Sequence, residues 1–356
     1  MNRKWTLLMT FVLALALLVT GCQAQAPAPA APAPAEQAGE APSEGGEAEQ
    51  AMETFRIAIV MPSSTTDLAW SQAMYDALLA VQAEMGGEDA LEIAYSEGMF
   101  QVTDAAAAIR DYAAEGYDLI IAHGTQYGNS MFEVAADFPE TSFAWGTATD
   151  TGEEQGLKNI FAYEAAADQG GYVNGVIAAK LTQSGIVGVV GPVEAGDAKL
   201  YIDGFQNGVL ATKPDAVVNI SYTGSFGDTA LAAEAANVHI QAGADVLTGS
   251  AQQVVGAVGV AKEAGVYWLG TQSDQTSLAP EIVVANQIYD WTGVIKDMIQ
   301  LHKSGTLGGK AYTITLENGG LKMVFNDQID IPDEVKAAAQ EAIDGIVAGE
   351  IQTLTE

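Results

Sequence analysis

The chain has 356 residues, and its 46 acidic and 14 basic side chains give a formal net charge of −32. So acidic a surface disfavours nucleic acids and anionic lipids as partners. The single cysteine, Cys22, excludes an intrachain disulfide framework, so the hydrophobic core has to hold the fold.

Residues 1–21 have the build of a secretory signal peptide, with Arg3 and Lys4 ahead of an almost wholly apolar run at 5–19. This run is short for a membrane span, which needs about 20 residues. The sequence VTGC that ends at Cys22 resembles a bacterial lipobox, which predicts cleavage before the cysteine and lipidation of its thiol. An ordinary signal peptide with an incidental cysteine is the alternative.

Residues 22–53 consist mainly of Ala, Pro, Glu, Gln and Gly, with hardly a large apolar side chain. Such a segment buries too little surface to offset its chain entropy. The Ala-Pro repeats favour an extended polyproline conformation. We expect a disordered tether that holds a folded receptor off a membrane surface through the lipid on Cys22.

From Phe55 onward, apolar strand patterns alternate with helical patterns. A first series predicts strands at 55–61, 91–95, 118–124 and 141–146, with helices at 67–85, 103–115 and 127–137. A second series predicts helices at 165–181, 197–211, 229–241 and 254–263, with strands at 185–192, 217–222, 244–249 and 266–270. Apolar strands separated by helices indicate parallel sheets covered on both faces, so the two series predict two α/β lobes.

The last part of the chain is predicted to complete both lobes. It offers a strand at 282–285, a helix at 291–303, weak strands at 312–316 and 322–325, and a helix that Pro332 opens. We place the crossings between lobes near Tyr163, Asn286 and Tyr312. The N-terminal lobe is then 54–163 plus 287–311, and the C-terminal lobe is 164–286 plus 312–356.

Ligands of open parallel sheets bind beyond the carboxyl ends of the strands, which nominates the loops that follow them. These loops hold Gly, Ser, Thr, Gln, Asp and aromatic residues, as suits a small polar ring compound. The nominated loops are 62–72, 96–101, 123–128, 191–201, 223–228, 248–253 and 270–275.

Signals for catalysis, metals and cofactors are weak. The sequence has no HExxH, CxxC, GxGxxG, Walker or GxSxG pattern, so we expect no enzyme, no metal site and no cofactor. Pairs of carboxylates are expected by chance among 46 acidic residues. His239 and His302 are predicted at the surface of helices, whereas His123 follows a buried strand and is open to either core or cleft.

Several stretches together resemble the basic-membrane-protein family of ABC-transporter substrate-binding lipoproteins, which includes purine nucleoside receptors. They are DLAWSQAMYDAL (67–78), YDLIIAHG (117–124), FPETSFA (138–144), GGYVNGVIAAKL (170–181), GIVGVVG (185–191), DGFQNGV (203–209), YTGSFGD (222–228), GADVL (243–247) and AKEAGVYWLGTQSDQ (261–275). The resemblance covers nearly all of 55–350. It implies a type I periplasmic-binding-protein fold, in which two Rossmann-like lobes joined by a hinge close on a small molecule.

The resemblance also implies a biological role. Proteins of this kind are extracytoplasmic receptors that hand a ligand to an ABC permease, and we expect a monomer anchored through Cys22. A sensor that reports to a membrane signalling partner, or a receptor for a flavin or a sugar, is the alternative. A LacI-type regulator shares the lobes, but the signal peptide argues against it.

The family motifs are altered at several positions. In DLAWSQ, Trp70 takes the place of a stacking Phe, and Ser71 that of an Asn that reads the base. In GTQSDQ, Gln272 replaces the Asp that binds ribose hydroxyls, and a family Lys falls on Asn286. Neutral amides in both places would leave no unpaired charge in the cleft, which predicts a planar ring ligand whose sugar is absent or held differently.

Other candidates come from the loops and the crossings. Phe226 and Tyr201 are candidate aromatics of the opposite wall of the cleft. For Trp145 and Trp291 the pattern allows a position in the core or in the cleft. Trp268 is expected in the core. The full set of predicted ligand-binding residues is Asp67, Trp70, Ser71, Gln72, His123, Gly124, Tyr127, Trp145, Asp168, Tyr201, Phe226, Ser250, Gln272, Asp274, Asn286 and Trp291.

Overall fold

A computed structural model describes residues 54–354, so the predicted signal peptide, Cys22 and the tether lie outside the described residues. The described residues belong to one compact unit and contain two six-stranded sheets. None of the helices between residues 54 and 354 has the length and apolar character needed to cross a membrane.

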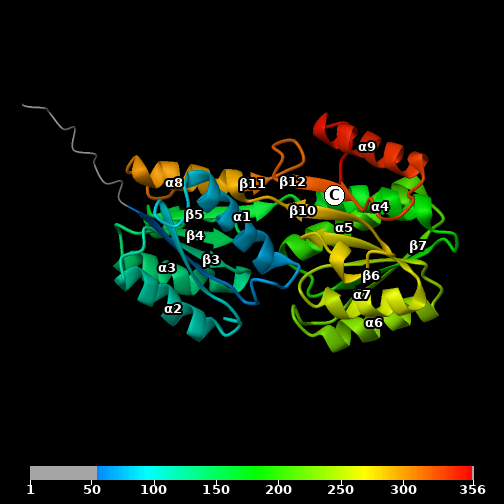
Figure 1. Ribbon diagram of the computed structural model, residues 1–356, viewed down its shortest axis with the longest axis horizontal. Helices are drawn as coiled ribbons and strands as arrows, with labels where there is room; N and C mark the ends of the chain where they lie inside the picture. The colour runs from blue at the N-terminus through cyan, green and yellow to red at the C-terminus, as the bar shows by residue number, and fades with distance from the viewer. Residues whose placement is uncertain (1–53, 355–356) are drawn as a thin grey trace, which may run out of the picture. The chain divides into compact units, whose positions relative to one another are not determined.

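The first sheet has the order β2-β1-β3-β4-β5-β11, and all of its strand pairs are parallel. Helices α1 and α8 pack together on one face and α2 and α3 on the other (Figure 1). The elements are β1 (Phe55–Val60), α1 (Trp70–Met85), β2 (Leu91–Ser96), α2 (Val102–Ala114), β3 (Leu119–His123), α3 (Gly128–Asp137), β4 (Ser142–Gly146), β5 (Ile160–Ala165), α8 (Thr292–Lys303) and β11 (Ala311–Ile314).

The second sheet repeats this arrangement in the order β7-β6-β8-β9-β10-β12, with β12 antiparallel to β10. Helices α4 and α5 pack closely together, α9 lies on α4, and α6 and α7 pair on the other face (Figure 1). The elements are α4 (Ala167–Leu181), β6 (Ile186–Gly191), α5 (Gly196–Thr212), β7 (Val217–Tyr222), α6 (Thr229–Gln241), β8 (Val246–Gly249), α7 (Val254–Ala264), β9 (Tyr267–Gln272), β10 (Val283–Tyr289), β12 (Leu321–Phe325) and α9 (Asp333–Val347).

The apolar periodicity accounts for the packing. Helix α1 buries Trp70, Met74, Leu78 and Val81, the face predicted from their spacing. Strands β3 and β4 are almost continuously buried, as expected for a parallel sheet with helices on both faces. The predicted fold class, α/β with two lobes of mostly parallel strands, is confirmed.

Strand β5 is an element that the pattern did not indicate. Its sequence IFAYEA leads with almost no interval into the apolar start of α4, so strand and helix patterns merge. The hydrogen-bond ladder resolves them, because β11 pairs with β5 as far as Ile314 and Ala165. Ladder pairing also continues to Tyr289 in β10. The crossings predicted near Tyr163, Asn286 and Tyr312 therefore lie within strands β5, β10 and β11.

The surface placement of two histidines was wrong. His239 on α6 is only 3% exposed, and its Nε2 lies 3.1 Å from the carbonyl oxygen of Val189. It fits because Gly188 on β6 has no side chain where the ring packs. His302 on α8 is half-buried, with Nδ1 2.8 Å from the hydroxyl of Ser142. Both rings turn toward an interior strand of the sheet that their helix covers, β6 for His239 and β4 for His302.

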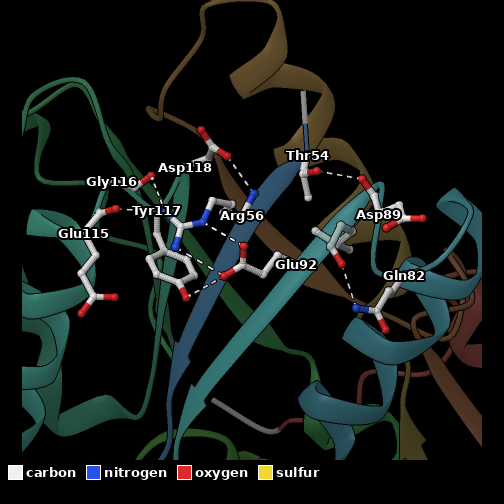
Figure 2. Close-up of polar contacts among 10 residues, drawn as sticks. Thr54, Arg56, Gln82, Asp89, Glu92, Glu115, Gly116, Tyr117 and Asp118 are labelled. Carbon is white, nitrogen blue, oxygen red and sulfur yellow. Dashed lines mark hydrogen bonds and ion pairs between the residues drawn. The ribbon is translucent and has the colours of Figure 1, made fainter. Parts of the chain in front are cut away.

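A polar cluster fixes the amino-terminal end of β1 (Figure 2). The Arg56 guanidinium donates to Glu92 at 3.0 Å and lies 4.0 Å above the ring of Tyr117, whose hydroxyl donates to the same carboxylate. The carboxylate of Asp118 accepts the backbone N–H of Arg56 at 2.7 Å. The pair with Arg56 lowers the pKa of Glu92. These groups satisfy one another at the strand end opposite the ligand loops.

Candidate functional site

A cavity lies where the carboxyl ends of the two sheets face each other. Its volume is about 80 Å³, which is narrow for a site that takes a small molecule. All seven loops nominated from the sequence contribute to it, with Thr147 after β4 in addition. We call this cavity the cleft; it is lined by Pro62, Trp70, Phe100, Gly124, Thr125, Gln126, Thr147, Ala195, Gly196, Asp197, Ala198, Phe226, Ala251, Gln252 and Gln272.

Trp70 forms the centre of the first-lobe wall. Its indole stacks on the ring of His123, with centroids 4.0 Å apart and planes 4° from parallel. The indole N–H donates to the carbonyl oxygen of His123 at 3.1 Å, and His123 Nε2 lies 2.9 Å from the carbonyl oxygen of Trp70. Two hydrogen bonds and a stack therefore fix the plane of the indole.

His123 supports Trp70 and does not itself line the cleft. It is fully buried, and Nδ1 lies 2.6 Å from the hydroxyl of Tyr163. Because the carbonyl of Trp70 can only accept, we infer that Nε2 carries the proton and Nδ1 accepts from Tyr163. Burial lowers the pKa of His123 to about 3, so the ring is neutral at physiological pH.

The residues around the start of α1 hold the loop and leave the cleft to Trp70. Helix α1 begins after Ala69, and the Asp67 carboxylate accepts the N–H groups of Ala69, Ser71 and Gln72 at 2.9–3.2 Å. Ser71 is buried with its hydroxyl 2.6 Å from Ser63. Predicted ligand contacts at Asp67, Ser71 and Gln72 are thus occupied by local bonds and lie outside the lining.

Three further predicted aromatics support this wall from behind. Tyr127 is buried and donates its hydroxyl to the carbonyl of Met99 at 2.7 Å. Trp145 donates to the carbonyl of Gly124 at 3.2 Å, so it orients a cleft residue without lining the cleft itself. Trp291 is fully buried, with its ring edge-on to Trp70 at 6.0 Å.

The second-lobe wall carries Phe226 and two strained residues. Phe226, from the loop after β7, is half-buried and is the aromatic that this lobe contributes. Ala251 and Gln272 have φ of 68° and 74°, a left-handed conformation that side chains other than glycine rarely adopt. Such strain gathers at functional sites, where the surrounding structure enforces it.

Several lining residues are absent from the predicted contacts, and Asp197 is the ionisable one among them. It lies in the first turn of α5, is 5% exposed, and one carboxyl oxygen has no hydrogen-bond partner among the described residues. Burial raises the pKa of this carboxyl well above its ordinary value, and the charge of Glu164 adds to the effect. Neutral residues at 272 and 286 therefore do not leave the cleft without an acidic group, because Asp197 enters it from α5.

The remaining predicted contacts lie away from the cleft. Tyr201 is buried between Asn174 and Thr248, with its hydroxyl within 2.8 Å of each, so it is not a wall aromatic. Asp168 accepts a hydrogen bond from Thr353. Asp274 and Asn286 bond to each other at 3.0 Å, and Ser250 is buried beside the cleft without lining it.

Contacts between the lobes fix the width of the cleft. Ser273 donates to the carbonyl of Ala69 at 2.9 Å, and Gln275 donates to that of Leu68 at 3.3 Å. A Cβ placed on Gly196 would lie 3.2 Å from the hydroxyl of Thr147, so glycine permits the approach of α5. The two walls are thus in contact at the rim of the cleft.

The charge of the lining is one-sided. Among the described residues no Lys, Arg or His lines the cleft, and Asp197 is its only ionisable side chain. Three aromatic residues, Trp70, Phe100 and Phe226, contribute to the walls. This arrangement suits a neutral or cationic planar compound and disfavours an anionic one.

Fold and cleft together define a two-lobed solute-binding protein. The sequence profile of the Bmp family, described as ABC transporter substrate-binding protein PnrA-like, matches residues 54–352. The chain belongs to this family, and it is therefore an ABC-transporter substrate-binding protein.

Three known proteins show how the chain compares. It is 27% identical to a purine-binding protein of Brucella abortus over 310 residues, 87% of this chain and 86% of the relative. It is 28% identical to a protein of Haloferax volcanii named as a candidate ABC transporter glucose-binding protein, over 308 residues, 86% and 74% of the two chains. A solved ABC transporter solute-binding protein of Conexibacter woesei has a TM-score of 0.68 at 23% identity, covering 84% of this chain and 98% of its own.

Proposed function

We propose that this protein is the extracytoplasmic receptor of an ABC importer and captures a small planar ring compound, a nucleobase, a nucleoside or a related molecule. The observation that carries this proposal is the cleft between Trp70 on one lobe and Phe226 on the other. The protein delivers the compound to a permease and catalyses no reaction.

The departures from the family motifs support a retuned ligand. Gln272 lines the cleft where nucleoside receptors of the family carry an acidic residue, whereas Asn286 is fully bonded to Asp274, Gln275 and Thr276. Both N–H groups of the Asn286 amide are engaged, so this side chain has no donor left for a ribose oxygen. We therefore propose that the ring is recognised first and that any sugar is held differently or is absent.

A sugar is the second candidate. The name of the Haloferax volcanii relative favours it, and the aromatic walls can also stack on a sugar ring. A sugar ligand requires several hydrogen-bond partners for its hydroxyl groups, and the cleft offers Asp197, Gln126, Gln252 and Gln272.

A thermal-shift panel on the full chain distinguishes these candidates. The protein is unfolded and refolded to strip carried ligand, then heated with nucleobases, nucleosides, riboflavin, glucose and amino acids. A ligand present at 100 times its dissociation constant adds about 2.7 kcal/mol to the stability, which is readily measured. A shift with ring compounds supports the proposal, and a shift with glucose alone overturns its ligand class.

Matched variants tie the shift to the cleft. Phe226→Ala removes a half-buried loop aromatic and should abolish the shift at unchanged ligand concentration. Tyr267→Ala removes an aromatic of β9 that is 40% exposed and does not line the cleft, so its shift should match the wild type. Equal loss in both variants would point to a general effect on folding.

Lipid anchoring at Cys22 is a separate proposal. It rests on the lipobox-like VTGC sequence and on the basic start and apolar run that precede it. Labelling of growing cells with a fatty-acid analogue should mark the wild-type chain. Cys22→Ser should abolish the label and release the protein from the membrane fraction, and label retained in that variant would contradict the proposal.

A further inference from the structure

Two buried hydrogen-bond acceptors of the cleft have no partner within the protein. They are Oδ2 of Asp197 and Oε1 of Gln272, and each residue is 5% exposed. Among the described residues, the other buried side-chain atoms without a partner are Asn174 Oδ1 and Trp291 Nε1, neither of which lines the cleft. The cleft therefore gathers unpaired acceptors on its second-lobe wall.

Unpaired buried acceptors destabilise a protein unless a ligand satisfies them. Gln272 adds backbone strain to this cost, since its φ of 74° is unfavourable for a side chain of its size. The remainder of the protein shows the contrast. Comparably buried groups such as Asn286 and Thr248 are fully engaged with neighbours.

The charge around Asp197 points to donors on the ligand. No basic side chain lines the cleft among the described residues, so the protein supplies no counter-charge there. Glu164 and Asp168 lie near enough to oppose ionisation of Asp197, and the N–H of Ala165 offsets them only in part. A ligand that brings positive charge or several N–H groups would relieve this repulsion.

We infer that Asp197 and Gln272 form a donor-selective subsite that takes an amino-substituted or cationic nitrogen heterocycle in preference to its oxo-substituted counterpart. The inference rests on the proposed function, since it names the class of ring compound that the same cleft accepts. A planar amino heterocycle presents its N–H groups in the plane of the ring. Trp70 and Phe226 can then cover its faces while the two acceptors meet its edge.

The test compares ligands that differ in one group. Isothermal titration of the stripped, refolded full chain at pH 7 uses adenine against hypoxanthine and adenosine against inosine. We expect the amino member of each pair to bind at least tenfold more tightly. This preference is measured in the wild-type protein and does not depend on any variant.

A matched pair of variants assigns the preference to Asp197. Asp197→Asn keeps the shape of the side chain but cannot ionise in response to a ligand donor, and it should weaken adenine binding at least tenfold and hypoxanthine binding less than threefold. Asp203→Asn, two turns further along α5 and paired with Lys199 at the surface, should change neither affinity.

The outcomes separate this inference from the proposed function. Equal or tighter binding of hypoxanthine and inosine overturns the inference and leaves the ring-binding receptor intact. An amino preference that survives Asp197→Asn also overturns it. Binding of glucose without any ring compound overturns both.

Discussion

The two walls of the cleft differ in how their polar groups are satisfied. On the first lobe, Trp70, His123 and Tyr163 are joined by hydrogen bonds that run from Trp70 through His123 to the phenol of Tyr163. On the second lobe, Asp197 and Gln272 keep unpaired acceptors, and Ala251 and Gln272 have left-handed backbones. The first wall is a prebuilt stacking platform, whereas the second is complete only when a ligand supplies donors.

This contrast suggests a division of labour. A platform held by a stack and hydrogen bonds needs no rearrangement to accept a ring face. Unpaired acceptors contribute nothing to stability without a ligand but discriminate strongly between ligands, because a wrong ligand leaves them unsatisfied.

Acid should lower the stability of the folded protein through His123, which supports the platform. The pKa of His123 is about 3 in the folded protein, against 6.5 as its ordinary value. The unfolded chain therefore takes up a proton first, and stability falls as the pH drops below 6.5, by about 1.4 kcal/mol per pH unit for this group. Chemical denaturation of wild type and His123→Asn at pH 7 and pH 4 should show a smaller loss in the variant. Identical losses would contradict the neutral buried ring.

Removing the indole of Trp70 should lower the free energy of unfolding by a similar amount. Trp70→Ala should lower the free energy of unfolding by about 3–5 kcal/mol, because a large buried side chain leaves a cavity. Binding of ring compounds should also disappear. Trp70→Phe keeps an aromatic face and should recover part of both. A Trp70→Ala protein that binds as tightly as the wild type would remove Trp70 from the site.

A substitution in the second-lobe wall should raise the stability of the ligand-free protein, whereas substitutions in the platform lower it. Asp197→Asn should stabilise the ligand-free protein at pH 7, because the raised pKa of the carboxyl means that ionisation opposes folding. The sign follows from proton linkage. The folded state holds the proton more tightly, so the stability that Asp197 contributes is present at low pH and is lost as the pH rises above the ordinary value of 3.8.

Thermal melts at pH 4 and pH 7 measure this difference. The variant should melt at a higher temperature than the wild type at pH 7. At pH 4 the two melting temperatures should be equal. A constant difference at both pH values would show that Asp197 is not held in an environment that disfavours its charge.

Relief of backbone strain should give the smallest effect. Ala251→Gly should raise stability by about 0.5–1 kcal/mol, since glycine adopts a φ of 68° without a steric penalty. Ala257→Gly, in the interior of α7, serves as the control and should lower stability by a similar amount or more. Equal loss in both variants would indicate that Ala251 is not strained.

Most of the fold follows from local sequence pattern. Apolar runs and helical spacing identify nearly every element, and the rule about strand ends identifies every segment that lines the cleft except the one at Thr147. What local pattern could not supply is which side chains are already engaged. Asp168 meets Thr353 from far along the chain, and Tyr201 meets Thr248 across the sheet. Such partners emerge only after folding.

Asp197 was hidden for a related reason. It is one of 46 acidic residues, and it lies outside the stretches that resemble the family. Its only local signal is its place in a nominated loop, just after Gly196 and in the first turn of a helix. Its isolation from basic partners is a property of the folded cleft.

Tryptophan fluorescence during ligand titration tests the central claim most directly. If a ring compound stacks on the platform, adenine should quench the emission of the stripped full chain. The quenching should be largely lost in Trp70→Phe, while isothermal titration still detects binding. Unchanged quenching in Trp70→Phe, or a response to glucose and to no ring compound, would contradict a cleft built to hold a ring against Trp70.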